Sequence, residues 1–140
     1  MQEIKFRAWF KNENEIKKVA INNIYEGNKT YLHLSPLPMS DYKPIELMQY
    51  TGLKDSNGRE IFEGDIVRFV IFDYLGSDIE YKGVVKYRSG LYEIWKDVDS
   101  EFFDSDGPFI LNHAWLQDDE FEVIGNIYEN PELLEGVNVG

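Results

Sequence analysis

The chain of 140 residues contains no cysteine, which excludes disulfides, thiolate metal sites and cysteine nucleophiles. It has two histidines, His33 and His113, and neither sequence context shows the nucleophile and orienting acid of a catalytic triad. No apolar run approaches the roughly 18 residues of a membrane span. Glu3, Lys5 and Arg7 stand where a signal peptide needs an apolar core. We therefore predict no catalytic residue and expect a cytoplasmic protein.

Basic residues are scarce in the last third of the chain. Residues 1–92 carry 13 acidic and 13 basic side chains, whereas residues 93–140 carry 13 acidic side chains and one basic, Lys96. The whole net charge of −12 therefore lies in residues 93–140. Binding to a phosphate backbone depends on Lys and Arg that displace counterions, so we expect this third to repel nucleic acid at neutral pH.

Sequence patterns that bind cofactors are missing as well. The chain has neither a GxxxxGKS loop nor a GxGxxG loop for nucleotides. The acidic run at residues 97–106 suggests calcium, which takes several carboxylate oxygens. However, Phe102 and Phe103 interrupt the ligand spacing of an EF-hand loop. We predict no metal and no cofactor, and we interpret the run as an acidic loop that faces solvent or a partner.

The residues that are present favour a β-rich fold. Apolar residues make up 43% of the chain, with 21 aromatics, enough for a core without disulfides. Ile4, Phe6, Ala8 and Phe10 alternate with other residues, as in a half-buried strand, and residues 17–24 and 30–34 predict two more strands. Three prolines in residues 35–44 predict a connector. We therefore expect an amino-terminal β element with its connector at 1–44 and a second part at 45–140.

The most informative stretch runs from Tyr50 to Val67, YTGLKDSNGREIFEGDIV. Residues 55–58, DSNG, predict a tight turn, because Asp and Asn side chains bond nearby backbone and Gly accepts a positive φ. Strands are expected on both sides, at residues 47–53 and 59–62. A second bend at 63–65, EGD, then leads into an apolar strand at 66–72.

The remaining residues continue the β pattern. Strands at 79–88 and 91–96 flank Ser89-Gly90, a two-residue hairpin loop of the favoured kind. A polar loop follows at 97–108, and the alternation in residues 121–128 predicts a closing strand. Pro131 suits the first position of a short helical turn at 132–135. Short strands separated by turns, without a long amphipathic segment, predict an all-β barrel or meander.

Three segments together resemble the YopX family of phage and prophage proteins. They are IKFRAW from Ile4 to Trp9, the stretch TGLKDSNGREIFEGDIV, and EVIGNIYENPELL from Glu122 to Leu134. The resemblance implies a mainly β protein with an SH3-like barrel after the amino-terminal β element, encoded by a phage or prophage and present in the bacterial host cell. The family has no assigned activity, so the resemblance supplies no catalytic, metal or cofactor residue.

We therefore expect a non-enzymatic module that binds another protein, either a host protein or a second copy of the chain, and not a membrane. Interfaces of this kind use aromatic anchors with charged rims. The partner-binding candidates are the residues around the two turns and two tryptophans: Tyr50, Arg59, Glu63, Asp65, Trp95 and Trp115. The competing interpretation is structural, in which Gly52, Gly58 and Gly64 are required by backbone geometry alone.

Three alternatives stay open. Lys82, Lys86 and Arg88 alternate on one strand, which would suit nucleic-acid association through the neutral part of the chain. The carboxylates of residues 93–140 would alternatively imitate phosphates and occupy a host DNA-binding protein. A hydrolase built on paired carboxylates is the third alternative, although 26 acidic residues make any such pair undiagnostic.

Overall fold

The structure is a computed structural model, and its residues fall into two compact units, Met1–Tyr50 and Thr51–Gly140. It describes residues 5–26, 29–35, 45–72, 76, 78–100, 108–117 and 120–135. For residues 20–26, 29–35, 72, 113, 116 and 117 the description covers the backbone. Of the connector predicted at residues 35–44, all but Ser35 lies outside the described residues. The units divide within a strand, after Tyr50, whereas the predicted parts divide after residue 44.

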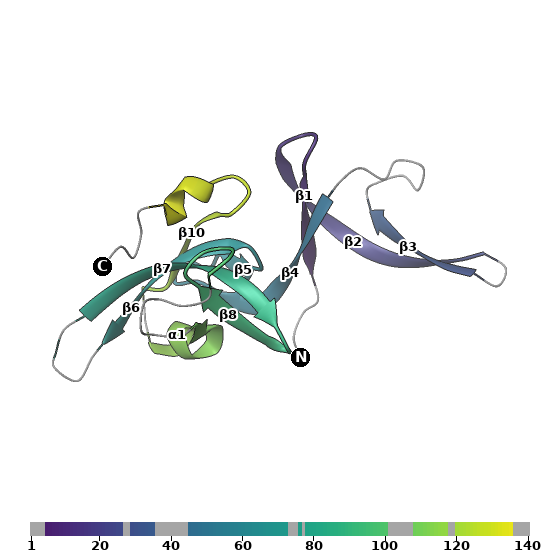
Figure 1. The fold of residues 1–140 in the computed structure, drawn as a ribbon. Coiled ribbons are helices and arrows are strands. Elements are labelled where there is room, and N and C mark those ends of the chain that lie inside the picture. Colours follow the sequence, from purple (N-terminus) through teal and green to yellow (C-terminus); the bar gives the residue numbers. More distant parts are fainter. Residues whose placement is uncertain are drawn as a thin grey trace. The chain divides into compact units, whose positions relative to one another are not determined.

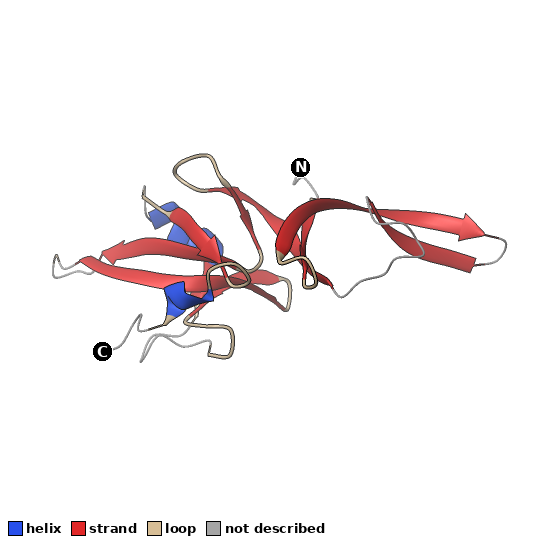
Figure 2. Ribbon diagram, turned by 90° about the horizontal axis from the view of Figure 1, so that it is seen from above, coloured by secondary structure: helices blue, strands red, loops and turns tan. Residues whose placement is uncertain are grey.

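The described part of the chain is mainly β, as predicted (Figure 2). Its strands form two antiparallel sheets of five. The first sheet has the order β3-β2-β1-β4-β5, and the second has the order β10-β6-β7-β8-β9. The strands are β1 (Phe6–Phe10), β2 (Glu15–Glu26), β3 (Lys29–Ser35), β4 (Ile45–Lys54), β5 (Glu60–Phe62), β6 (Asp65–Phe72), β7 (Asp78–Arg88), β8 (Leu91–Trp95), β9 (Phe109–Ile110) and β10 (Glu122–Asn126). The SH3-like barrel itself stays a prediction.

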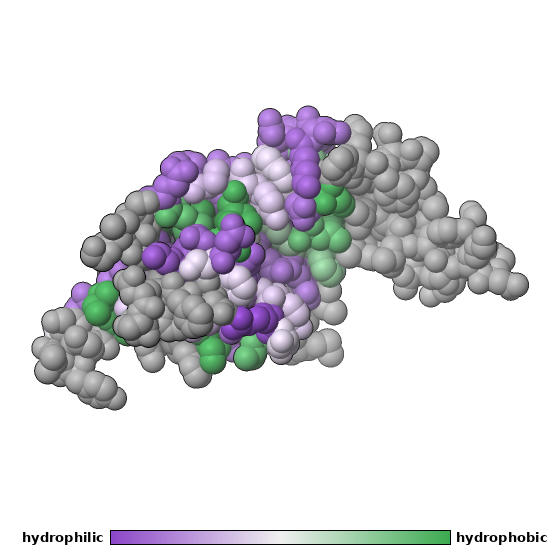
Figure 3. All heavy atoms as spheres, viewed as in Figure 1, coloured by the Kyte–Doolittle hydropathy of each residue, from purple (hydrophilic) through white to green (hydrophobic). Residues whose placement is uncertain are grey.

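In the first unit, β1 lies between β2 and β4. The alternation that predicted this strand directs Ala8 and Phe10 inward, where they are 0% and 2% exposed and pack with Val19 of β2. The turn between β1 and β2, at residues 11–14, is exposed, and hydrophilic side chains gather over it (Figure 3). Beyond Val19, β2 pairs with β3, from Ala20 opposite Ser35 to Glu26 opposite Lys29.

The hydrophobic cluster around Phe69 lies on one face of the sheet of the second unit. Phe69 of β6 is 1% exposed, and its ring lies 5.6 Å from Phe121, 5.7 Å from Tyr81 and 5.3 Å from Phe109. The helix α1 (Leu111–Gln117) covers this face, because its buried Leu111 belongs to the same cluster. Neighbouring aromatics in stacked and edge-on contacts add to the stability that burial supplies.

The opposite face is covered at its centre by the segment that follows β10. Ile66 and Val84 are cross-strand partners and both are 0% exposed. Gly125 lies opposite Ile66, and a Cβ built on it would stand 2.7 Å from Leu133 of η1 (Pro131–Leu134). Figure 1 shows α1 and η1 on opposite sides of β6 and β7. Both faces of the sheet are therefore buried where β10, β6 and β7 meet.

The helix α1 corrects the all-β prediction for this region. Its sequence, LNHAWLQ, is two turns long, too short for a clear helical period, and has no charged residue in its terminal turns. Tertiary burial of Leu111 and Ala114 stabilises it instead.

The helical turn predicted at 132–135 is confirmed as the 3-10 helix η1, with Pro131 at its start. No helix in the described part is long and apolar enough to cross a membrane.

Candidate functional site

The predicted turn at residues 55–58 is confirmed, and the Asp55 carboxylate organises it. Oδ1 of Asp55 accepts hydrogen bonds from the backbone N–H groups of Asn57 and Arg59, at 2.9 and 2.8 Å. Gly58 has φ +81 and donates its N–H to the Asp55 carbonyl at 3.0 Å. Asp55 itself is 7% exposed, so its charge is compensated by backbone donors and hardly by water.

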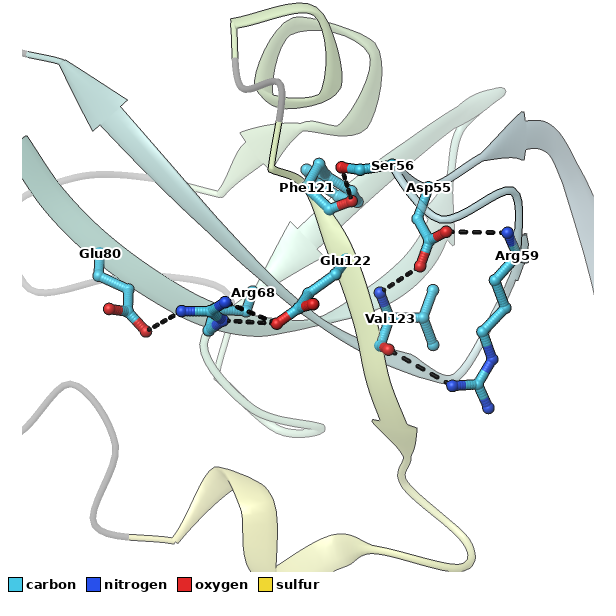
Figure 4. A network of polar contacts seen from close by, with 8 residues as sticks. All are labelled: Asp55, Ser56, Arg59, Arg68, Glu80, Phe121, Glu122 and Val123. Atoms are coloured by element: carbon cyan, nitrogen blue, oxygen red, sulfur yellow. Dashed lines mark hydrogen bonds and ion pairs between the residues drawn. The ribbon is translucent and has the colours of Figure 1, made fainter.

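The same turn holds β10, which is 64 to 68 residues away in the sequence (Figure 4). Oδ2 of Asp55 accepts the N–H of Val123 at 2.9 Å, and Nη1 of Arg59 donates to the Val123 carbonyl at 3.4 Å. The N–H and hydroxyl of Ser56 both donate to the Phe121 carbonyl, at 2.9 and 2.6 Å. We call these four bonds from residues 55, 56 and 59 to residues 121 and 123 the Asp55 bracket.

The second bend, at residues 63–65, is also confirmed and is directed inward. Asp65 is 1% exposed, and its Oδ2 accepts the N–H of Phe62 at 2.7 Å. Gly64 has φ +84, donates its N–H to the Val85 carbonyl at 2.8 Å and accepts the N–H of Ile127 at 2.9 Å. This bend therefore fixes β7 and the end of β10 at one point.

Asn126 builds the turn that follows β10. It is 5% exposed, and its Oδ1 accepts the N–H groups of Tyr128 and Glu129 at 3.0 and 2.8 Å. Its Nδ2 donates to Oε1 of Glu129 at 2.8 Å, and its carbonyl accepts the N–H of Asn130 at 2.9 Å. In the segments GREIFEGD and EVIGNIYENP, the side chains of Arg59, Asp65 and Asn126 thus bond the backbone of the second unit.

The predicted partner-binding residues near these turns lie in different settings. Tyr50 is 4% exposed and belongs to the first unit, and Asp65 is also buried. Arg59 is exposed, but its guanidinium is part of the Asp55 bracket. Glu63 is half-buried and lies close enough to Tyr92 to contribute to the raised pKa of that phenol.

The two tryptophans also differ. Trp115, on α1, packs against the core of the second unit and donates its indole N–H to the Lys54 carbonyl at 2.7 Å. Its indole therefore fixes α1 to the end of β4. Trp95, at the end of β8, is half-buried and lies among charged side chains of β7 and β8. Of the five predicted residues in the second unit, Asp65 is buried, Arg59 bonds β10 and Trp115 bonds Lys54, whereas Trp95 belongs to a surface cluster.

The cluster around Trp95 is held together by Glu93. Oε1 of Glu93 accepts the indole N–H of Trp95 at 3.1 Å and lies 3.0 Å from Nε of Arg88, while Oε2 accepts Nη2 of Arg88 at 3.3 Å. Nζ of Lys86 and Cζ of Arg88 lie 5.2 and 5.4 Å from the centre of the Trp95 ring, within the range of cation–π attraction. We call Lys86, Arg88, Glu93 and Trp95 the hairpin cluster.

The loop that joins β7 to β8 presents two further side chains. Ser89 and Gly90 have φ +51 and +88, which is the type I′ geometry predicted for this loop. On either side of it, Tyr87 is 54% exposed and Leu91 is 50% exposed. The sequence analysis missed Tyr87 and Leu91. Their position in the sequence could have predicted their exposure, because side chains near a two-residue turn at the end of a hairpin extend into solvent.

Behind the exposed Tyr87, Tyr92 is half-buried, and the two rings form an edge-on pair 5.2 Å apart. Burial raises the pKa of Tyr92 to about 12, and the charge of Glu63 and the neighbouring Tyr87 add to the effect. Tyr92 is therefore neutral at any physiological pH, and it gives the exposed Tyr87 a firm apolar backing.

The basic strand face predicted from Lys82, Lys86 and Arg88 carries charges of both signs. On the neighbouring β6, Arg68 lies 2.7 Å from Glu122 and 3.4 Å from Glu80, and hydrogen bonds to these two carboxylates raise the pKa of its guanidinium (Figure 4). Glu93 compensates Arg88 in the same way. This face is therefore a mixed-charge surface, which attracts a phosphate backbone less than isolated cations would.

Among the residues that the structure describes, no group of three or more His, Asp or Glu side chains is arranged to hold a metal ion. The acidic loop is described at residues 97–100, where Oδ1 of Asp97 accepts the N–H of Asp99 at 2.8 Å. Residues 101–107 and the side chains of His33 and His113 lie outside the described residues.

Comparisons with known proteins identify the family of the chain. The chain matches the family model "YopX protein" over residues 5–135. It is 35% identical over 80 residues to the SPbeta prophage-derived uncharacterized protein YopX of Bacillus subtilis (strain 168), an alignment that covers 57% of this chain and 54% of that protein. The chain thus spans about half the length of this curated relative. The crystal structure of protein EF1440 from Enterococcus faecalis is similar, with 28% identity and a TM-score of 0.57 over 96% of this chain and 100% of that one. The chain therefore belongs to the YopX family.

Proposed function

We propose that this chain is a phage- or prophage-encoded accessory protein that acts by binding another protein and performs no chemistry of its own. The prophage origin of its relative in Bacillus subtilis supports the first part. The inward use of the polar residues at the turns supports the second, because Asp55, Asp65 and Asn126 are committed to backbone hydrogen bonds. We also propose that the second unit is an SH3-like barrel, in which the Asp55 bracket closes β10 against the turn after β4.

The observation that carries the proposal is the hairpin cluster with its exposed neighbours. Trp, Tyr and Arg dominate the binding energy of protein interfaces, and all three occur on this hairpin, with Trp95 and Arg88 on one face and Tyr87 on the other. Glu93 is 12% exposed at its side chain and holds both Arg88 and Trp95 in place. A surface that is ordered before binding loses less conformational entropy when the partner arrives. The β7–β8 hairpin therefore has the composition and the rigidity of a contact surface.

The partner class that this surface favours is protein, whether a host protein or a second copy of the chain. Nucleic acid is less favoured because Glu93 compensates Arg88, while Glu80 and Glu122 compensate Arg68 on the same face. The net charge of −12 adds a general repulsion toward phosphates.

Affinity capture from bacteria that carry the phage or prophage tests the proposal. We expect the wild type to retain a partner that the double variant Tyr87→Ser/Leu91→Ser does not retain. Ile79→Ser is the matched control, because Ile79 is a 44% exposed apolar residue at the other end of β7. Equal capture by the wild type and the double variant would place the contact surface elsewhere.

Two further outcomes would replace the proposal with the alternatives. Binding to duplex DNA at physiological salt without a divalent cation, lost on charge reversal of Lys82, Lys86 and Arg88, would identify a nucleic-acid-associated protein. Capture of a basic DNA-binding host protein that the hairpin variants retain and that high salt releases would identify a DNA mimic acting through residues 93–140.

A further inference from the structure

The strand β10 is the end strand of its sheet, with β6 on one side. An end strand exposes a row of backbone donors and acceptors, and these groups can pair with a strand of another molecule. Proteins prevent such pairing by covering the edge, by shortening it or by placing charges on it. The outer edge of β10 is therefore a place where this fold needs protection.

The Asp55 bracket occupies that edge. The bonds it makes go to the Phe121 carbonyl and to both the N–H and the carbonyl of Val123. These groups point away from β6, since along an antiparallel strand successive residues direct their backbone groups to alternate sides. The Asp55 carboxylate, the N–H and hydroxyl of Ser56 and the Arg59 guanidinium thus take the place that a further strand would take.

We propose that the Asp55 bracket is a cap that keeps β10 from pairing with β10 of a second copy of this chain. The uncapped edge is self-complementary, because the N–H and carbonyl of Val123 would exchange bonds with the same groups of the second copy across a two-fold axis. In that antiparallel register Glu122 lies opposite Ile124, so like charges do not face each other across the pair. The cap and the contact surface on the β7–β8 hairpin are independent of each other.

The test removes two of the four bonds of the cap, leaves those of the Ser56 N–H and the Arg59 guanidinium, and measures molecular mass. The double variant Asp55→Ala/Ser56→Ala loses the carboxylate and the hydroxyl. Asp97→Ala is the matched control, since it loses a similar aspartate-to-backbone bond in a turn that contributes none of the four bracket bonds. Light scattering across a concentration series should show the double variant doubling in mass relative to the wild type. The control should keep the wild-type mass. A folded double variant with the wild-type mass at every concentration would overturn the proposal.

A second measurement decides the matter if the double variant does not fold. Asp55→Asn keeps the size of the side chain and replaces one acceptor oxygen with an N–H₂ donor. In this variant, hydrogen exchange at the Val123 amide should be at least tenfold faster than in the wild type, at a protein concentration where the chain does not associate further. An unchanged exchange rate at Val123 would show that the carboxylate does not cover the edge, and the proposal would be wrong.

Discussion

Replacement of Asp55 by alanine is the most informative single perturbation of this protein. The carboxylate is 7% exposed and accepts three backbone N–H groups, from Asn57, Arg59 and Val123, at 2.8 to 2.9 Å. Alanine removes both acceptor oxygens, and with them all three hydrogen bonds, and introduces no new bulk. The change therefore tests whether the turn at residues 55–58 and β10 depend on one side chain.

The expected loss of stability depends on whether water can reach each of the three N–H donors once the carboxylate is gone. Val123 is 7% exposed, so its N–H stays buried without an acceptor, which costs about 1–3 kcal/mol. Asn57 and Arg59 are exposed, so water can replace their acceptor, and together they add roughly 1 kcal/mol. We expect Asp55→Ala to lower the free energy of unfolding by about 2–4 kcal/mol, a large fraction of the roughly 5–15 kcal/mol of an ordinary domain.

Urea unfolding followed by circular dichroism measures this loss. The control is Asp97→Ala, because Asp97 accepts the N–H of the exposed Asp99 and its loss should cost about 0.5 kcal/mol or less. A loss below about 1 kcal/mol for Asp55→Ala would refute the reasoning, since it would mean that water reaches the Val123 N–H and replaces the carboxylate.

Three other predictions concern single positions in the second unit. Gly58→Ala should lower the free energy of unfolding by about 1–2 kcal/mol in urea unfolding. The cause is backbone strain, because φ is +81 and a Cβ there meets nothing within 4 Å. Gly58→Asn should lose less stability, and equal stability of the wild type and both variants would contradict this prediction. Gly125→Ala should cost about 1–3 kcal/mol by steric overlap, since its Cβ would stand 2.7 Å from Oδ1 of Asn130 and from Leu133; an unchanged thermal midpoint would show that η1 moves aside freely. The pKa of Tyr92 is raised from 10.0 to about 12, so this phenol binds its proton more tightly in the folded state. Its contribution to stability is complete below pH 10 and is lost as the pH rises towards 12. The ultraviolet titration of the wild type should contain a late-ionising tyrosine that Tyr92→Phe lacks.

Local patterns in the sequence were sufficient to predict most strands and turns. The alternation around Ala8 predicted β1, and the DSNG and Ser89-Gly90 patterns predicted two turns whose glycines have positive φ. These predictions succeeded because each depends on neighbouring residues and on the intrinsic conformational range of glycine. The helix α1 was missed because tertiary burial, and not a local period, stabilises a segment of seven residues.

The long-range bonds could not be predicted from one sequence. The partnership of Asp55 with Val123 joins residues 68 apart, and nothing in the local pattern of either residue names the other. The hairpin cluster was found in part: Trp95 was a candidate, whereas the bonds from Glu93 depend on the register that places Glu93 opposite Lys86. The sequence showed where charge accumulates along the chain. The hydrogen-bonded pairing of β6 with β7 and β10 decides which charges form ion pairs, as Arg68 does with Glu80 and Glu122.

The most direct test of the proposed contact surface is a hydrogen-exchange footprint of the protein with its captured partner. We predict that binding slows exchange in residues 84–95, around Trp95, and leaves residues 55–65 and 121–130 unchanged, because the polar groups of those two segments are already bonded within the fold. Protection confined to residues 55–65, with no change in the β7–β8 hairpin, would contradict the account and would assign the contact surface to the turns after β4.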